Sequence, residues 1–205
     1  MGMNMAGTDA PFGLAPWGEV IHSSIYAVVT ANAVAMAVGD LVEAVGDALT
    51  TAKYGTIQSC ITEETGAAGS LIGAVLALFD HDGLPVNRIA VTTTGDSVVA
   101  GYALVADSPD QLYIAAEDGD TSSIQVADIG LNANMISTHA AAAGNNYRSK
   151  MEIDSNTIAN TATLALKVLG VHPDDTISAA GAAGNHARFI VKIHTPYLGT
   201  DHTSL

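Results

Sequence analysis

The stretch GYALVADSPDQLYIAAE, residues 101–117, holds two apolar runs separated by a turn signal. The runs ALVA (103–106) and LYIA (112–115) have the length of strands and are too short for helices. Between them lies DSPD, residues 107–110. Asp and Ser side chains bond to nearby backbone and Pro presets φ, so this segment favours a tight connection. The stretch therefore predicts a strand, a turn and a second strand near the middle of the chain.

Short apolar runs alternate with turn clusters along the rest of the chain. Residues 71–79 are an apolar run of strand length that ends at the turn signal DHDG (80–83). In residues 188–194 two sets of side chains alternate, and a period of two places one set on the core face and the other outward. Many short strands separated by turns predict a mainly β fold, an antiparallel barrel or sandwich with few short helices. Further strands are expected at 40–45, 48–52, 57–61, 87–94 and 162–169, with a turn or single helical turn within 126–134. Strands are also favoured within 21–38, although this Ala- and Val-rich segment could be helical by propensity.

The first 18 residues predict an extended N-terminal arm, because Gly and Pro recur and break any regular period. The apolar residues Phe12, Leu14 and Trp17, the last being the only Trp, distinguish this arm from a disordered tail. They are expected to dock either on the chain's own body or on a neighbouring subunit. These three residues are therefore the candidate contact with a neighbouring subunit.

Residues 19–195 are expected to form the β-rich body, as one unit or as two subdomains split near 95–100, and residues 196–205 a C-terminal tail. A chain of 205 residues can bury a substantial core. Charged residues make up only 14% of the chain, which is well below their usual share, and aromatic residues make up 5%. This composition favours tight sheet packing and further burial in an oligomer or lattice. A monomeric β protein with an uncharged polar surface also fits it.

The charge balance excludes two classes of partner. The net charge is −14, from 21 acidic and 7 basic residues, and the first Lys or Arg is Lys53. Nucleic acids and anionic membranes are both bound through clustered Lys and Arg, so we expect neither as a partner. No apolar stretch approaches the roughly 20 residues that span a bilayer, and the start lacks the pattern of a secretory signal. Synthesis in a cytoplasm is expected.

The sequence contains no recognisable catalytic motif. The glycine-rich pieces 66–69 and 181–184 lack the lysine of a phosphate-binding loop, and no G-x-S-x-G elbow is found. Cys60, the only cysteine, is expected to pack in or near the core. The seven histidines show no zinc-ligand spacing and are expected to be satisfied loop residues. We therefore predict no enzyme activity, no catalytic residue, no cofactor and no metal site.

The strongest metal candidate is the loop Glu117–Asp120 (EDGD), because clustered carboxylates with a glycine suit Ca²⁺. The loop lacks the twelve-residue pattern of an EF-hand. A solvated acidic hairpin tip explains the same residues.

Residues 101–120 (GYALVADSPDQLYIAAEDGD) and 126–135 (VADIGLNANM) resemble a family of tailed-phage virion structural proteins. The shared features are an apolar strand, a D-x-P turn, a second apolar strand, an acidic loop and an A-D-x-G-x-N-A segment. The likeness extends over residues 38–194, including VGDLV (38–42) and MEIDS (151–155). The long cation-free N-terminal segment and the histidine-bearing tail after Thr195 depart from the family pattern.

The resemblance implies a capsid decoration or cement protein, with a mainly β body on the outer surface of the capsid. Such a protein often forms a homotrimer at local three-fold positions. The implied partners are the major capsid protein and further copies of this chain, and the implied location is the virion, after synthesis in the host cytoplasm. The family has no catalytic residues to carry over. The alternatives are another virion component, such as a tail, fibre or minor capsid protein, and a calcium-binding or enzymatic β domain.

Overall fold

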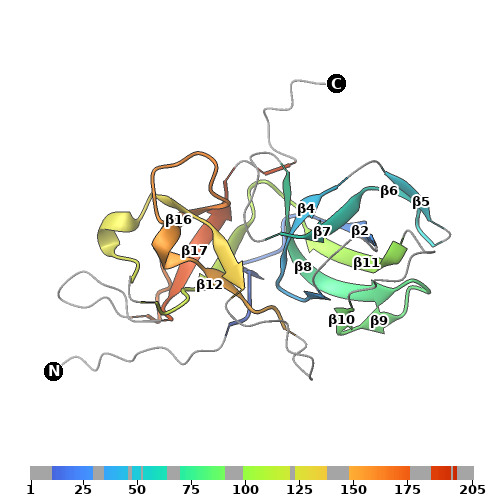
Figure 1. The fold of residues 1–205 in the computed structure, drawn as a ribbon, viewed down its shortest axis with the longest axis horizontal. Coiled ribbons are helices and arrows are strands. Elements are labelled where there is room, and N and C mark those ends of the chain that lie inside the picture. Colours follow the sequence, from blue (N-terminus) through green and yellow to red (C-terminus); the bar gives the residue numbers. More distant parts are fainter. Residues whose placement is uncertain are drawn as a thin grey trace.

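The computed structural model describes residues 11–29, 35–45, 48–51, 53–63, 70–90, 99–120, 123–137, 148–175, 186–194 and 196–197. These residues form a mainly β protein, as predicted. The described helical segments are two short 3-10 turns, η1 (Val126–Asp128) and η2 (Ser155–Thr157), and η1 lies where a single helical turn was expected. Figure 1 shows two β lobes side by side, one coloured blue to green and the other yellow to red.

The first lobe is a closed barrel of five strands. Its ring runs through β2 (Ser23–Val29), β7 (Ser59–Thr62), β4 (Leu41–Ala44), β8 (Leu71–Asp80) and β11 (Val99–Ala106). The pairing of β11 with both β8 and β2 closes the ring. Strands β2 and β7 are parallel and the other neighbours are antiparallel. Closure gives every strand of the ring two neighbours, which removes the open edges of a flat sheet.

Closure of the barrel depends on close contact between β8 and β11. At Gly73 a Cβ atom would lie 1.8 Å from the carbonyl oxygen of Ala106, so glycine is required there. Cys60 is buried inside the barrel, as predicted, and burial raises the pKa of its thiol to about 12, which keeps it neutral and unreactive. The barrel core contains Tyr26, Val28, Met36, Val42, Cys60, Ile72, Val75, Leu78, Ile89, Ala103 and Val105.

Small strand pairs complete the first lobe. Strand β9 (Pro85–Val86) pairs with β8 beside the ring. Strand β3 (Met36–Ala37) pairs with β10 (Arg88–Ile89), and β5 (Leu49–Thr51) pairs with β6 (Gly55–Ile57).

The second lobe is built on a five-stranded antiparallel sheet. Its order is β1 (Ala15–Pro16), β12 (Leu112–Ala116), β17 (Arg188–Ile193), β16 (Leu166–Val171) and β13 (Asn132–Ala133). Strands β14 (Met135–Ser137) and β15 (Met151–Ile153) form a separate antiparallel pair. A parallel bridge between Glu117 and Ile153 joins that pair to the end of β12.

One hydrophobic core extends across both lobes. Along β8, Leu71 and Ala74 point into this shared core, whereas Ile72 and Val75 point into the barrel. Both faces of β8 are thus buried, which explains why its sequence is a continuous apolar run and does not alternate. The fully buried members of the shared core include Leu14, Leu41, Leu71, Tyr113, Ile124, Met135, Ile153, Leu166 and Phe189.

The chain passes from the barrel to the second sheet at residues 107–111. Strand β11 belongs to the barrel, so the change of sheet lies after the split expected near 95–100. Buried Asp107 fixes this crossover, because it accepts hydrogen bonds from His22 Nδ1 (2.6 Å) and the Tyr26 hydroxyl (2.9 Å). The predicted turn is present, but the two strands beside it enter different sheets.

Strand ends differ from the predictions in places. Residues 162–165 form turns and β16 begins at Leu166, because the Ala165 N–H donates to Asn134 Oδ1 (3.1 Å) instead of joining a strand ladder. The expected C-terminal tail begins on the body, since the Tyr197 N–H donates to the Leu71 carbonyl (2.6 Å). Residues 91–98 and 198–205 lie outside the described residues.

Candidate functional site

The predicted arm is folded onto the body from residue 11 onward, and residues 1–10 lie outside the described residues. Leu14 is 1% exposed and belongs to the shared core, and its N–H donates to the Gly39 carbonyl (2.8 Å). Next to it, Ala15 and Pro16 pair with Ile114 and Tyr113 of β12. Of the three residues named as the candidate capsid or subunit contact, Leu14 thus docks on the chain's own body, which was one of the two expected positions. Its burial means that residues 11–18 are part of the body.

The other two predicted contact residues keep some exposure. Phe12 is half-buried and lines a cavity of about 390 Å³ together with Leu76 and Arg148. Trp17 is 36% exposed, and its ring packs edge-to-face on His172, with centroids 5.1 Å apart. Both residues thus dock on the chain's own body, and Trp17 still presents part of its ring to solvent.

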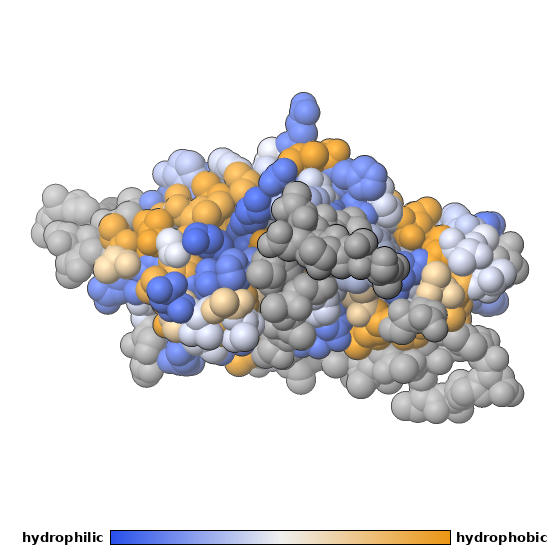
Figure 2. Space-filling view, turned by 90° about the horizontal axis from the view of Figure 1, so that it is seen from above, coloured by the Kyte–Doolittle hydropathy of each residue, from blue (hydrophilic) through white to orange (hydrophobic). Residues whose placement is uncertain are grey.

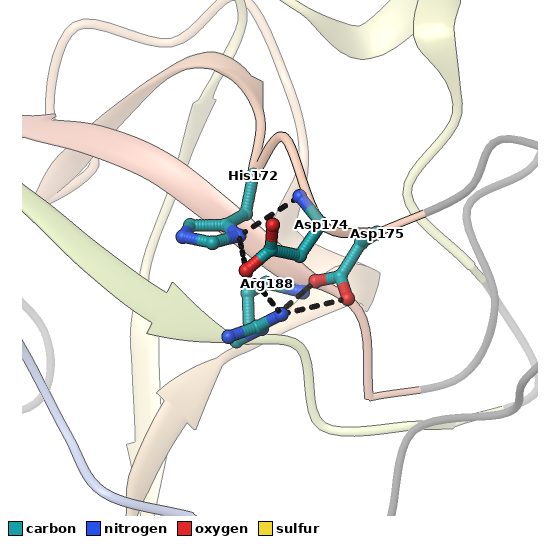
Figure 3. Close-up of polar contacts among 4 residues, drawn as sticks. All are labelled: His172, Asp174, Asp175 and Arg188. Carbon is teal, nitrogen blue, oxygen red and sulfur yellow. Dashed lines mark hydrogen bonds and ion pairs between the residues drawn. The ribbon is translucent and has the colours of Figure 1, made fainter.

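His172 leads into a charged cluster at the end of the β16–β17 hairpin (Figure 3). The Arg188 guanidinium donates to both carboxylate oxygens of Asp175, at 3.1 and 3.2 Å, and lies 3.8 Å from Asp174. The Asp174 N–H donates to His172 Nδ1 at 3.2 Å. Partial burial alone would raise the pKa of Asp175, but the hydrogen bonds from Arg188 outweigh it and lower that pKa. The cluster therefore binds the turn that follows β16 to the first residue of β17.

Arg188 also begins a row of side chains on the outer face of the second sheet. Along β17, Phe189, Val191 and Ile193 are buried, whereas Arg188, Ile190 and Lys192 are only partly buried, which confirms the predicted alternation. We call this outer surface the lysine face. It comprises Leu112, Ile114, Lys167, Leu169, Arg188, Ile190 and Lys192.

The strand register brings two lysines together on the lysine face. Lys192 lies directly opposite Leu112 on one side and Lys167 on the other. Lys192 is paired with Asp110, at 2.9 Å between Nζ and Oδ1. Leu169 sits at the β-bulge of β16 and is 39% exposed. In the view from above, Figure 2 shows hydrophobic residues beside strongly hydrophilic ones over the left lobe, which is the second lobe.

A second polar site lies where β12 ends. Glu117 is fully buried, and neither of its carboxylate oxygens has a hydrogen-bond partner in the part of the chain that the structure describes. Burial raises its pKa to about 8, and the negative charges of Asp118 and Glu152 add to this effect. The Ile124 N–H approaches the carboxyl without reaching hydrogen-bond geometry and offsets only part of the increase. Glu117 is therefore mostly protonated at neutral pH.

Glu152 lies near Glu117, and His186 lies beside Glu152. Glu152 is 1% exposed, and its Oε1 atom lies 3.8 Å from His186 Nδ1. The His186 ring covers Gly119 so closely that a Cβ atom there would lie 2.2 Å from the imidazole. The first part of the acidic loop is thus packed against the body, whereas Asp120 at its end is exposed.

The rest of the acidic loop is bonded to η2. The Ser155 hydroxyl donates to Asp118 Oδ1 at 2.8 Å, and the Asn156 amide donates to Asp120 Oδ2 at 2.6 Å. Within the described residues, no group of three or more His, Cys, Asp or Glu side chains could hold a metal ion. The arrangement therefore supports a structural role for the carboxylates that suggested calcium.

Comparison with protein-family models, with curated proteins and with solved structures finds no match to this chain. Among the described residues, no helix has the length and apolar character to cross a membrane. Sequence reasoning missed the lysine face as a site. The outward positions of Lys167 and Lys192 could be read from the strand periodicity, but their pairing across β16 and β17 could not.

Proposed function

We propose that this chain is a non-enzymatic virion structural protein, a capsid decoration or cement protein. It binds the outer surface of the major capsid lattice as a homotrimer and stabilises that lattice. The proposal rests on the resemblance at residues 101–135 and on the lysine face.

The aliphatic side chains in the outward positions of the lysine face, one exposed and three partly buried, are the observation that carries the proposal. An antiparallel sheet with one solvated face normally alternates apolar-in with polar-out. Here Leu112, Ile114 and Ile190 lie in the outward positions of β12 and β17, and Leu169 is more than a third exposed on β16. Apolar surface rimmed by charged residues is typical of a protein contact site.

The segments that resemble virion proteins also build this sheet. Residues 101–120 contain most of β11, the crossover and β12, and residues 126–135 contain η1 and β13. The resemblance therefore falls on the elements that join the two lobes and position the lysine face. It favours a role in which the shape of the body, instead of a reactive group, is the functional feature.

Symmetry explains how a modest contact could stabilise a lattice. A trimer at a three-fold position would present three copies of the same face to three related capsid surfaces. Linked contacts bind with a high effective concentration, so weak individual contacts give a stable complex. A net charge of −14 opposes nonspecific association with nucleic acid during assembly.

Quantitative mass spectrometry of particles produced from the genome that encodes this chain tests the proposal. We expect a copy number that equals that of the major capsid protein or is a simple fraction of it set by three-fold positions. A handful of copies per particle would replace the proposal with a tail or portal component. Complete absence from purified particles would overturn the virion role.

A further inference from the structure

Lys167 and Lys192 form an opposed pair of like charges on the lysine face. Directly opposite residues on antiparallel strands have Cβ atoms about 5 Å apart, and like charges in these positions destabilise a sheet. Lys192 is compensated by Asp110 at 2.9 Å. Lys167 is exposed and makes no ion pair with any described residue. The sheet thus retains an uncompensated cation beside a second one.

Cations are scarce in this chain, which makes their grouping informative. The lysine face carries Lys167, Arg188 and Lys192, three of the seven basic residues of a protein with 21 acidic ones. Arg188 and Lys192 are held by aspartates, so Lys167 is the cation of this face that is left for a partner. Leu169, two residues further along β16, adds an exposed aliphatic side chain next to it.

We propose that Lys167, supported by Lys192 and Leu169, binds an acidic segment of a partner protein. A carboxylate of that segment pairs with the Lys167 ammonium and relieves the repulsion from Lys192, and an adjacent apolar side chain packs on Leu169. This inference rests on the proposed function and identifies the partner surface chemically, as an Asp- or Glu-bearing segment on the exterior of the major capsid protein.

The charge distribution favours an acidic protein segment over a nucleic acid. Polyanion binding needs several cations along the phosphate backbone, whereas the lysine face offers one uncompensated ammonium between aliphatic side chains. A single carboxylate flanked by apolar residues matches this spacing of charge and hydrophobic surface. Pairing of opposite charges at the rim of an apolar patch also fixes the register of a docked partner.

The experiment compares binding of three purified full-length proteins to particles that lack the chain, by quantitative co-sedimentation. The wild type is compared with Lys167→Glu and with the matched control Lys53→Glu, which changes an exposed lysine of the barrel lobe by the same charge. We expect Lys167→Glu to weaken binding by about tenfold or more and Lys53→Glu to change it less than about twofold.

Stability measurements separate a binding role from a structural one. Lys167→Glu places a carboxylate opposite Lys192, so its thermal midpoint is expected to equal or exceed that of the wild type while binding falls. Zero-length carbodiimide coupling of bound wild-type protein, followed by mass spectrometry, is expected to join Lys167 to an Asp or Glu of the capsid protein.

Each other outcome overturns a defined part of the reasoning. If the wild type binds and Lys167→Glu binds equally well, the inference fails and the proposed function stands. If the wild type does not bind particles, both fail. A crosslink from Lys167 to a second copy of this chain would overturn the assignment of the partner, because the occupant would then be another subunit.

Discussion

Replacing Glu117 by Gln is expected to stabilise the protein at neutral and alkaline pH. The Glu117 carboxyl is fully buried without a hydrogen-bond partner among the described residues, and burial raises its pKa from 4.5 to about 8. The folded protein therefore keeps a proton that the unfolded chain loses above pH 4.5. The contribution of Glu117 to the free energy of unfolding is therefore most favourable below pH 4.5. It decreases as the pH rises toward 8 and stays constant above pH 8.

The size of the effect follows from the difference in pKa between the two states. A difference of one pKa unit corresponds to about 1.4 kcal/mol, so the rise from 4.5 to about 8 gives a cost on the order of 5 kcal/mol above pH 8 and roughly 3 kcal/mol at pH 7. Gln has the shape of the protonated carboxyl and cannot ionise. The variant should match the wild type near pH 4.5 and exceed it increasingly as pH rises.

Urea unfolding at several pH values between 4.5 and 9, followed by circular dichroism, measures this difference. Glu19→Gln is the matched control, because Glu19 is exposed in the segment between β1 and β2. We expect its free energy of unfolding to stay within about 0.5 kcal/mol of the wild type at every pH. A stability difference between Glu117→Gln and the wild type that does not change with pH would show that Glu117 is ionised in the folded protein, and the reasoning would be refuted.

Three further substitutions test the packing. Leu14→Ala should lower the free energy of unfolding by about 3 kcal/mol, because the side chain is buried. Leu84 is 62% exposed, so Leu84→Ala should change the free energy of unfolding by less than about 0.5 kcal/mol. Equal effects of the two substitutions would contradict the burial of the N-terminal segment. Gly73→Val should cost at least about 3 kcal/mol, since its side chain would collide with the Ala106 carbonyl, and a stable variant in urea unfolding would rule out this barrel closure. Arg188→Ala should cost about 1 kcal/mol, because the pair with Asp175 is partly exposed, and the loss should shrink at high salt; a salt-independent loss would point to packing instead.

The sequence predicts local structure well where one strand alone determines it. The alternation along β17 predicted two sets of side chains on opposite faces, and the structure confirms it with Phe189 and Val191 in the core and Lys192 outward. The apolar run of β8 also marked a buried strand, because both of its faces meet a core. Such patterns depend on the period of the side chains and need no knowledge of neighbouring strands.

Features that depend on pairing could not be predicted. Lys167 and Lys192 are 25 positions apart, and only the β16–β17 register places them opposite each other. Leu14 and Glu117 have ordinary sequence surroundings, yet the meeting of distant strands buries both. A turn such as DSPD at 107–110 reports a change of direction but not whether the next strand returns to the same sheet.

The position of β12 makes its sheet depend on strands from distant parts of the chain. Its two neighbours in the sheet are β1, which starts at Ala15, and β17, which ends at Ile193. Strand β12 therefore receives one neighbour from residues synthesised before it and the other from residues synthesised long after it. A chain that stops between β16 and β17 contains all five strands of the barrel, but it lacks Arg188, Ile190 and Lys192. Under the proposed function, copies without β17 have no finished docking surface and cannot join the lattice.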